Sequence, residues 1–219
     1  MINKIRLLSE EELIKTGPVD HADWNYKSVI KYIQQKRFKL CVKLIKNSRS
    51  ERLLEIGYGS GIFIPTLNEI ASEIYGLDIH KKNKEIEDIL HKHNIKANLV
   101  SASAVKIPFE DSFFDSIFSI SAIEFIDELD TVCKEIKRVL KKDGFFIVIT
   151  PGYSSLLDLG LKILTKENAK LDYENRRKYI IPTLLKYFKL ENKITFPRFS
   201  IPSLRLYHGL KLIHQDEKS

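Results

Sequence analysis

The sequence predicts a doubly wound α/β fold, in which a mainly parallel sheet is covered by helices on both faces. Between residues 51 and 151, short apolar runs alternate with amphipathic helical patterns. These runs are continuously apolar, which is typical of strands that are buried on both faces. A loop with glycine at three alternate positions follows the first run, as expected where a strand turns sharply toward a helix.

The elements follow one another in the order that such a fold requires. We expect a short helix over residues 9–15, where Ser9 and Glu12 have capping-box spacing, and a longer helix over residues 27–46. The alternating region predicts strands at residues 52–56, 73–77, 97–101, 116–121 and 145–150, with helices at 62–71, 82–93 and 129–140 between them. After Pro151, helices at 154–164 and 173–188, the latter interrupted or restarted at Pro182, precede strands at 189–196 and 204–213 that would pair antiparallel.

This pattern divides the chain into two parts. Residues 1–50 are expected to form a helical lead-in and possible substrate cover. Residues 51–219 are expected to form the α/β domain itself, with a helical insertion at about 152–188. A chain of 219 residues suits one medium domain with such an appendage.

Composition favours a soluble, cytoplasmic chain. No apolar run approaches the roughly 20 residues of a membrane span, and the first residues do not lead into a signal-peptide core. Cys41 and Cys133 lie in helical apolar patterns and are expected to be reduced core residues. His91 and His93 are two positions apart on one helix, so they point in different directions and predict no metal site. The net charge of +7 permits a nucleic-acid partner, but the lysines are scattered through Glu/Lys-rich helices, which favours a solvated surface.

The glycine loop, residues 53–61 (LLEIGYGSG), is the strongest local signal for a ligand site. Gly57, Gly59 and Gly61 allow the backbone to approach a ligand closely, and the helix that follows offers free N–H groups. The spacing G-x-G-x-G differs from the G-x-G-x-x-G of dinucleotide sites, because position 62 is isoleucine.

An acidic residue ends the second predicted strand. The Asp78 carboxylate can accept hydrogen bonds from both hydroxyls of a ribose, and Ile79 beside it would offer an apolar face to adenine. The alternative role of Asp78 is to cap the helix that begins after Lys81. The alternative for the glycine loop is a tight turn from strand to helix without a ligand, and nucleotide cofactors of several kinds use related loops.

Four segments in order resemble the class I S-adenosylmethionine-dependent methyltransferases, in particular the ubiquinone/menaquinone-biosynthesis type (methyltransferase domain 11-like). They are the glycine loop with its preceding Glu55, residues 101–109 (SASAVKIPF), residues 114–122 (FDSIFSISA) and residues 135–144 (EIKRVLKKDG). The resemblance implies a seven-stranded sheet of order 3-2-1-4-5-7-6 with the seventh strand antiparallel. It also implies S-adenosylmethionine as cofactor, with contacts from Glu55, Gly57, Tyr58, Gly59, Gly61, Asp78, Ile79, Ser103, Ala104 and Ser119.

Two positions depart from the family pattern. Ser103 stands where the family usually has an aspartate that accepts from the adenine amino group, so its hydroxyl or backbone groups must take that role. Phe125 follows Glu124 where relatives often carry histidine, which removes a common imidazole near the acceptor.

The expected function is methyl transfer from S-adenosylmethionine to a small-molecule or lipid-like acceptor. The alternatives are an RNA methyltransferase and a non-catalytic S-adenosylmethionine-binding protein. Residues 119–122 (SISA) lack the Asn/Asp-Pro-Pro-aromatic motif of base-amino methyltransferases, so that reaction is not expected. The chemistry requires no fixed catalytic dyad. Candidate bases are Glu124, His21 and His208, and candidate substrate contacts are Trp24, Tyr26 and Tyr153.

Overall fold

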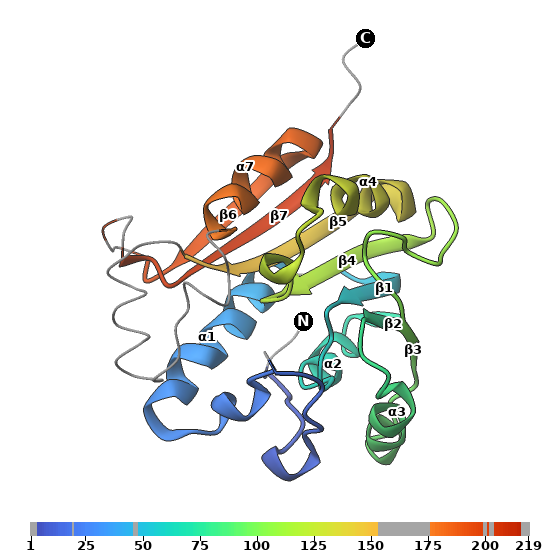
Figure 1. Cartoon of the computed structure of the whole chain (residues 1–219), viewed down its shortest axis with the longest axis vertical. Coiled ribbons are helices and arrows are strands. Elements are labelled where there is room, and N and C mark those ends of the chain that lie inside the picture. Colours follow the sequence, from blue (N-terminus) through green and yellow to red (C-terminus); the bar gives the residue numbers. More distant parts are fainter. Residues whose placement is uncertain are drawn as a thin grey trace.

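The fold is described from a computed structural model for residues 4–18, 20–45, 48–152, 176–198, 201 and 204–215. In these parts of the chain seven strands form one sheet of order β3-β2-β1-β4-β5-β7-β6 (Figure 1). The strands are β1 (Ser50–Ile56), β2 (Ala71–Asp78), β3 (Ala97–Ser101), β4 (Phe114–Ile120), β5 (Leu140–Pro151), β6 (Phe188–Phe196) and β7 (Tyr207–His214).

Strand direction in the sheet matches the expectation from the sequence. Strands β1 to β5 pair with their neighbours in parallel, whereas β7 is antiparallel to both β5 and β6. The predicted strand order and the antiparallel seventh strand are therefore confirmed. The carboxyl ends of β1, β2, β3 and β4 lie at the same edge of the sheet, since Ile56 pairs with Leu77 and Ser119, and Asp78 with Ser101.

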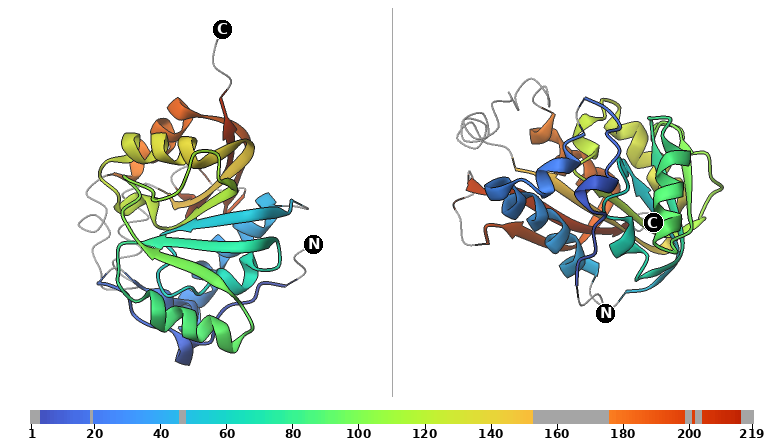
Figure 2. Two further views of the ribbon diagram at one scale, coloured as in Figure 1. Left: turned by 90° about the vertical axis from the view of Figure 1, so that its right-hand side faces the viewer. Right: turned by 90° about the horizontal axis from the view of Figure 1, so that it is seen from below.

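Helices cover both faces of the sheet (Figure 2). Helices α1 (Ser28–Ile45), α2 (Ile64–Leu67) and α3 (Asn83–Lys92) share one apolar core with the sheet. Helices α4 (Leu129–Val139) and α7 (Arg177–Tyr187) share the other. Successive strand residues alternate between the two cores, as with Leu53 and Leu54 on β1. Both cysteines are free and buried, Cys41 in the first core and Cys133 in the second, as predicted.

The lead-in contributes to the first core. Leu8 is fully buried there, and the backbone of Arg6 both donates to and accepts from the Thr66 hydroxyl, at 2.9 and 2.6 Å. Its helical content is less than predicted. The turn η1 (Glu10–Glu12) is a 3-10 helix, with Ser9 and Glu12 forming the expected capping box, and η2 (Ala22–Asn25) is a second 3-10 turn before α1.

Two of the predicted helices differ from the structure. The helix expected over 62–71 is reduced to α2, because the turns of the glycine loop continue to Phe63 and β2 already begins at Ala71. Helix α7 runs through Pro182 without the predicted break. The helix expected at 154–164 lies outside the described residues. No helix in the described part combines the length and apolar character required to cross a membrane.

Candidate cofactor and acceptor site

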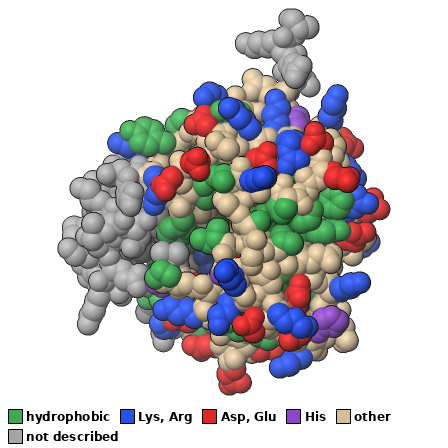
Figure 3. Space-filling view, turned by 45° about the vertical axis from the view of Figure 1, so that its right-hand side comes forward, with side chains coloured by type: hydrophobic (Ala, Val, Ile, Leu, Met, Phe, Trp, Pro, Cys, Tyr) green, Lys and Arg blue, Asp and Glu red, His purple; other side chains and the backbone are tan. Residues whose placement is uncertain are grey.

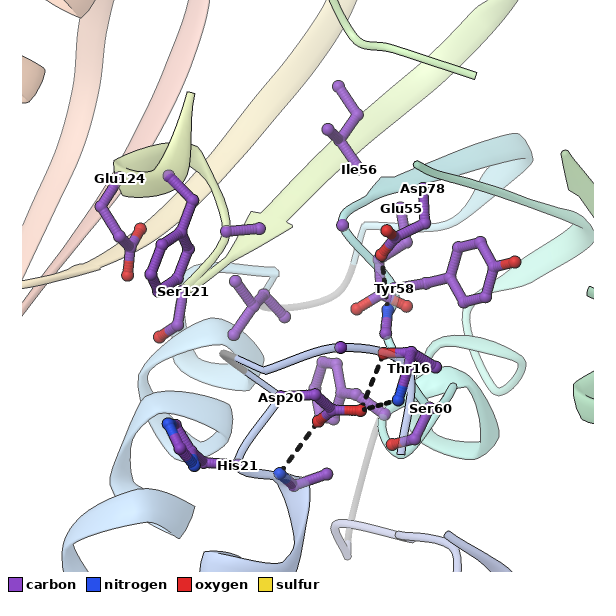
Figure 4. Close-up of a pocket in the computed structure, with 18 of the residues that line it drawn as sticks. Thr16, Asp20, His21, Glu55, Ile56, Tyr58, Ser60, Asp78, Ser121 and Glu124 are labelled. Carbon is purple, nitrogen blue, oxygen red and sulfur yellow. Dashed lines mark hydrogen bonds between the residues drawn. The ribbon is translucent and has the colours of Figure 1, made fainter. Parts of the chain in front are cut away.

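A cavity of about 770 Å³ opens at the sheet edge where β1, β2 and β4 end. Its walls come from the lead-in, α1, the glycine loop, the segments that follow β2, β3 and β4, and the start of β7. Residues far apart in the sequence therefore face one common space. Figure 4 shows Glu55 and Asp78 on one side of it and Glu124 on the other.

The glycine loop approaches the neighbouring backbone closely. Gly57, Gly59 and Gly61 have φ angles of +75°, +51° and +71°, which favour glycine. A Cβ atom on Gly57 would lie 2.2 Å from the Cβ of Ala122, so no larger residue fits. The loop after β4 is thereby held against the glycine loop. Gly61 does not line the cavity, because it faces Ile86 of α3 instead.

Asp78 ends β2 and holds the tip of the glycine loop. One carboxylate oxygen accepts from the Gly59 amide at 2.9 Å, and the other accepts from the Ile79 amide at 2.7 Å. The alternative role as a helix cap is wrong, since α3 is preceded by Lys82 and has no side-chain cap. A carboxylate has about four acceptor positions, so Asp78 can also accept from a ligand. Ile79 lines the cavity with 80% of its surface exposed, ready to be covered by an apolar ring.

Of the remaining predicted cofactor residues, Ser119 is the one that does not line the cavity. Ser103 and Ala104 line it beside Asp78, whose carbonyl accepts from the Ala102 amide at 2.9 Å. Tyr58 also lines the cavity, with its hydroxyl donating to Asn83 at 2.8 Å. Ser119 lies buried in the sheet between Ile56 and Val148 and does not line the cavity.

Glu55 is a buried carboxylate at the cofactor end. It is 4% exposed, and its Oε2 has no hydrogen-bond partner among the described residues. Burial, followed by the nearby charge of Asp78, raises the pKa of Glu55 to about 8, against the lowering effect of Arg37. An unpartnered carboxylate in this position can accept hydrogen bonds from a positively charged ligand group.

Two residues that line the cavity were not predicted from the sequence. Arg37 lines the cavity from α1, and its charge acts on both Glu55 and Glu124. Arg37 lies four residues after Ile33 and four before Cys41, so it is on the apolar side of α1. A charged residue at such a position is the signal in the sequence that could have indicated a functional role. His80 is the second, because its Nε2 lies 3.0 Å from the Gly59 carbonyl and its ring meets Tyr58 edge-on at 4.9 Å.

The lead-in supplies one of the two predicted aromatic contacts. Trp24 lines the cavity, and its ring stacks on His21 at 4.2 Å. Tyr26 does not line it. Its hydroxyl donates to the Leu8 carbonyl and its ring packs against the first core, so its substrate contact stays a prediction from the sequence. Tyr153 lies outside the described residues.

The three candidate bases occupy different environments. His208 does not line the cavity, and burial lowers its pKa to about 4; its role as a base stays a prediction from the sequence. His21 lines the cavity beside Trp24. Glu124, in the 3-10 turn η3 (Ile123–Phe125), lines it too and is 1% exposed. Burial raises the pKa of Glu124 to about 7, although Arg37 and Arg177 lower it.

The structure offers no cluster of three metal-ligating side chains within the described ranges. Of the two histidines, His91 lies on α3 and His93 directly follows it, and His93 contacts Glu12 of the lead-in, with 2.6 Å between Nε2 and Oε1. That contact ties α3 to the lead-in.

The site fits S-adenosylmethionine on the observations above. The glycine loop leaves backbone exposed where a side chain would clash. Asp78 can accept from ribose, Ile79 presents an uncovered apolar surface for adenine, and the unpartnered Glu55 suits a cation.

Comparison with known proteins gives the same result. Residues 54–148 match the family described as "Methyltransferase domain". The sterol 4-C-methyltransferase strm-1 of Caenorhabditis elegans is 35% identical over 104 residues, which are 46% of this chain and 31% of that protein. The ubiquinone biosynthesis O-methyltransferase of Pelagibacter ubique is 30% identical over 127 residues, 55% of this chain and 51% of that protein. The chain thus spans about half or less of the length of these relatives.

Among solved structures, the N-methyltransferase NodS from Bradyrhizobium japonicum in complex with S-adenosyl-L-homocysteine shares the fold. Its TM-score is 0.64 at 10% identity, over 90% of this chain and 94% of that chain. Residues 54–148 are thus similar to the methyltransferase-domain family, and the strand order of the sheet is part of a fold that the chain shares with NodS.

Proposed function

We propose that this protein transfers a methyl group from S-adenosylmethionine to a small-molecule acceptor. One observation carries the proposal: the glycine loop and Asp78 share a single cavity with Glu124, which lies across from Asp78 in Figure 4, and Trp24 also lines this cavity. Donor and acceptor can therefore be held together in one space.

The cofactor end has a partner for each part of S-adenosylmethionine. Asp78 would hold the ribose, and Ile79, Ser103 and Ala104 would contact the adenine. Arg37 would pair with the carboxylate of the methionine portion, and the ammonium of that portion would lower the pKa of Glu55 and pair with its carboxylate. When bound, the cofactor supplies a methyl group on a positively charged sulfur, so the protein has chiefly to orient the nucleophile.

A small acceptor suits the remaining space. The lead-in closes the cavity with Trp24 and His21, and Phe38 and Tyr207 add further aromatic walls. The two curated relatives are named for a sterol and for ubiquinone, which are both small molecules. On the face seen in Figure 3, basic and acidic side chains are interspersed, without the basic stripe that an RNA partner would favour.

The test is calorimetric titration with S-adenosylmethionine, followed by transfer of labelled methyl groups to three probes: phenol, thiophenol and benzylamine. We expect binding and at least one methylated product. Preference for a nicotinamide dinucleotide would overturn the cofactor assignment. Binding without transfer to any probe would favour a non-catalytic cofactor-binding protein. The cytoplasmic location stays a prediction from the sequence, which fractionation of cells expressing the tagged chain can test.

A further inference from the structure

Glu124 is a buried carboxylate that no other side chain satisfies. It is 1% exposed, and neither Oε1 nor Oε2 has a hydrogen-bond partner from another residue in the described parts of the chain. Burying an ionisable group without partners is costly, so such groups are usually paired or serve a ligand. Glu124 lines the cavity, and in Figure 4 its carboxylate points into it.

The position of Glu124 relates it to the cofactor end. It lies in η3, directly after β4, and two residues beyond Ala122. Ala122 is held against Gly57, whose added Cβ would overlap it at 2.2 Å. The segment that carries Glu124 is therefore fixed to the loop that we assign to the cofactor.

Three other elements contribute charged or titratable groups around Glu124. They are Arg37 of α1, Arg177 of α7, whose Nη1 donates to the Gly152 carbonyl at 2.9 Å, and Tyr207 of β7. Both arginines stabilise the charged carboxylate, but burial outweighs them and raises the pKa of Glu124 to about 7. A group of this kind can take up or release a proton near neutral pH.

We propose that Glu124 is the general base for a hydroxyl acceptor, so that the protein methylates oxygen. The inference rests on the proposed function. As the acceptor oxygen forms its bond to the methyl carbon, the bond from carbon to sulfur breaks and its electron pair remains on sulfur, which becomes neutral. The hydroxyl proton passes to the Glu124 carboxylate and leaves from there to water.

An amine acceptor fits this environment less well. An amine must lose its proton before it can attack, whereas a carboxylate beside it would stabilise the unreactive ammonium form. A hydroxyl group is neutral and a weak nucleophile, and its reactivity rises as a base removes the proton. A hydroxyl acceptor is therefore the one whose reactivity depends most on a base at this position.

Glu124→Gln tests the role of the base with two probes that differ in one atom. Phenol holds its proton at neutral pH, whereas thiophenol is largely ionised and requires no base. We expect Glu124→Gln to slow phenol methylation by about 100-fold or more and thiophenol methylation by less than about threefold. Glu124→Asp should restore part of the phenol rate, and the exposed Glu69→Gln is the matched control.

The outcomes separate this inference from the proposed function. Equal losses for phenol and thiophenol, no phenol methylation where thiophenol is methylated, or a preference for benzylamine would overturn the role of Glu124. Failure of the parent protein to bind S-adenosylmethionine, or to methylate any probe, would overturn the proposed function instead.

A second measurement requires no turnover. In protein labelled with ¹³C at the glutamate carboxyl groups, the signal lost in Glu124→Gln identifies Glu124. With S-adenosylhomocysteine bound, phenol should lower the pH midpoint of this signal, because its O–H stabilises the carboxylate. Anisole, which has no O–H group, should not lower it. The same midpoint with both probes would overturn the proposal.

Discussion

Removing the Asp78 carboxylate should abolish the ability of the protein to recognise ribose hydroxyls. Asp78 is 17% exposed in its side chain and is anchored by the Gly59 and Ile79 amides at 2.9 and 2.7 Å. A hydrogen bond to a charged group contributes about 1.5–3 kcal/mol, or roughly 10- to 100-fold in affinity. The parent protein should therefore prefer S-adenosylhomocysteine to its 2′,3′-dideoxy analogue by that factor, and Asp78→Ala should bind both alike.

Comparing the two ligands isolates the ribose contact from the loop. Asp78→Ala also frees the Gly59 amide, but a loosened glycine loop weakens both ligands equally, so only the direct contact changes their ratio. Isothermal titration gives the four dissociation constants. Asp88→Ala is a matched control, because Asp88 pairs with Lys84 on the outside of α3. If Asp78→Ala still discriminates the two ligands as strongly as the parent, Asp78 holds only the loop and the ribose assignment is refuted.

Three further predictions concern the glycine loop, the adenine end and the buried acid. Gly57→Ala should lower the free energy of unfolding in urea by about 2–4 kcal/mol, because of its positive φ and the contact with Ala122. Gly17→Ala, where nothing lies within 4 Å of the added methyl group, should change it by less than about 0.5 kcal/mol; equal effects would contradict the close approach. Ser103→Asp should leave affinity for S-adenosylhomocysteine unchanged or raise it, and a loss beyond about tenfold in calorimetry would show a differently built pocket. The pKa of Glu55 is raised from 4.5 to about 8, so the folded protein holds a proton that the unfolded chain releases, and stability should fall as pH rises through this window. The contribution of Glu55 to this fall is at most about 1.4 kcal/mol per pH unit. Glu55→Gln should remove that contribution and leave the one from Glu124, whereas equal slopes for variant and parent in urea titrations would contradict the buried carboxylate.

The strands and the glycine loop were predictable because they depend on local patterns, whereas the strand order followed from the resemblance to the methyltransferase family. Buried parallel strands are continuous apolar runs, and a glycine register requires particular backbone angles, so both remain visible in one sequence. Asp78 was placed beside the loop by the same logic, since strand ends meet at one edge of a parallel sheet. The structure locates its carboxylate 2.9 Å from the Gly59 amide.

The acceptor end was less predictable because it is assembled from distant segments. Trp24 and Tyr26 are two positions apart, and only the 3-10 geometry of η2 decides that Trp24 faces the cavity while Tyr26 bonds to Leu8. The burial of Glu124 depends on α1, α7 and β7 closing around it, which its neighbours in the sequence do not reveal. The position of His208 outside the cavity lining is hidden in the sequence for the same reason.

A crystal structure of the protein with S-adenosylhomocysteine tests the central claim most directly. We predict that the ligand lies in the cavity at the glycine loop, with both ribose hydroxyls on the Asp78 carboxylate and the adenine against Ile79 and Ser103. The sulfur should face the part of the cavity that contains Glu124. Ligand bound elsewhere, or in the cavity with its ribose away from Asp78, would contradict the account.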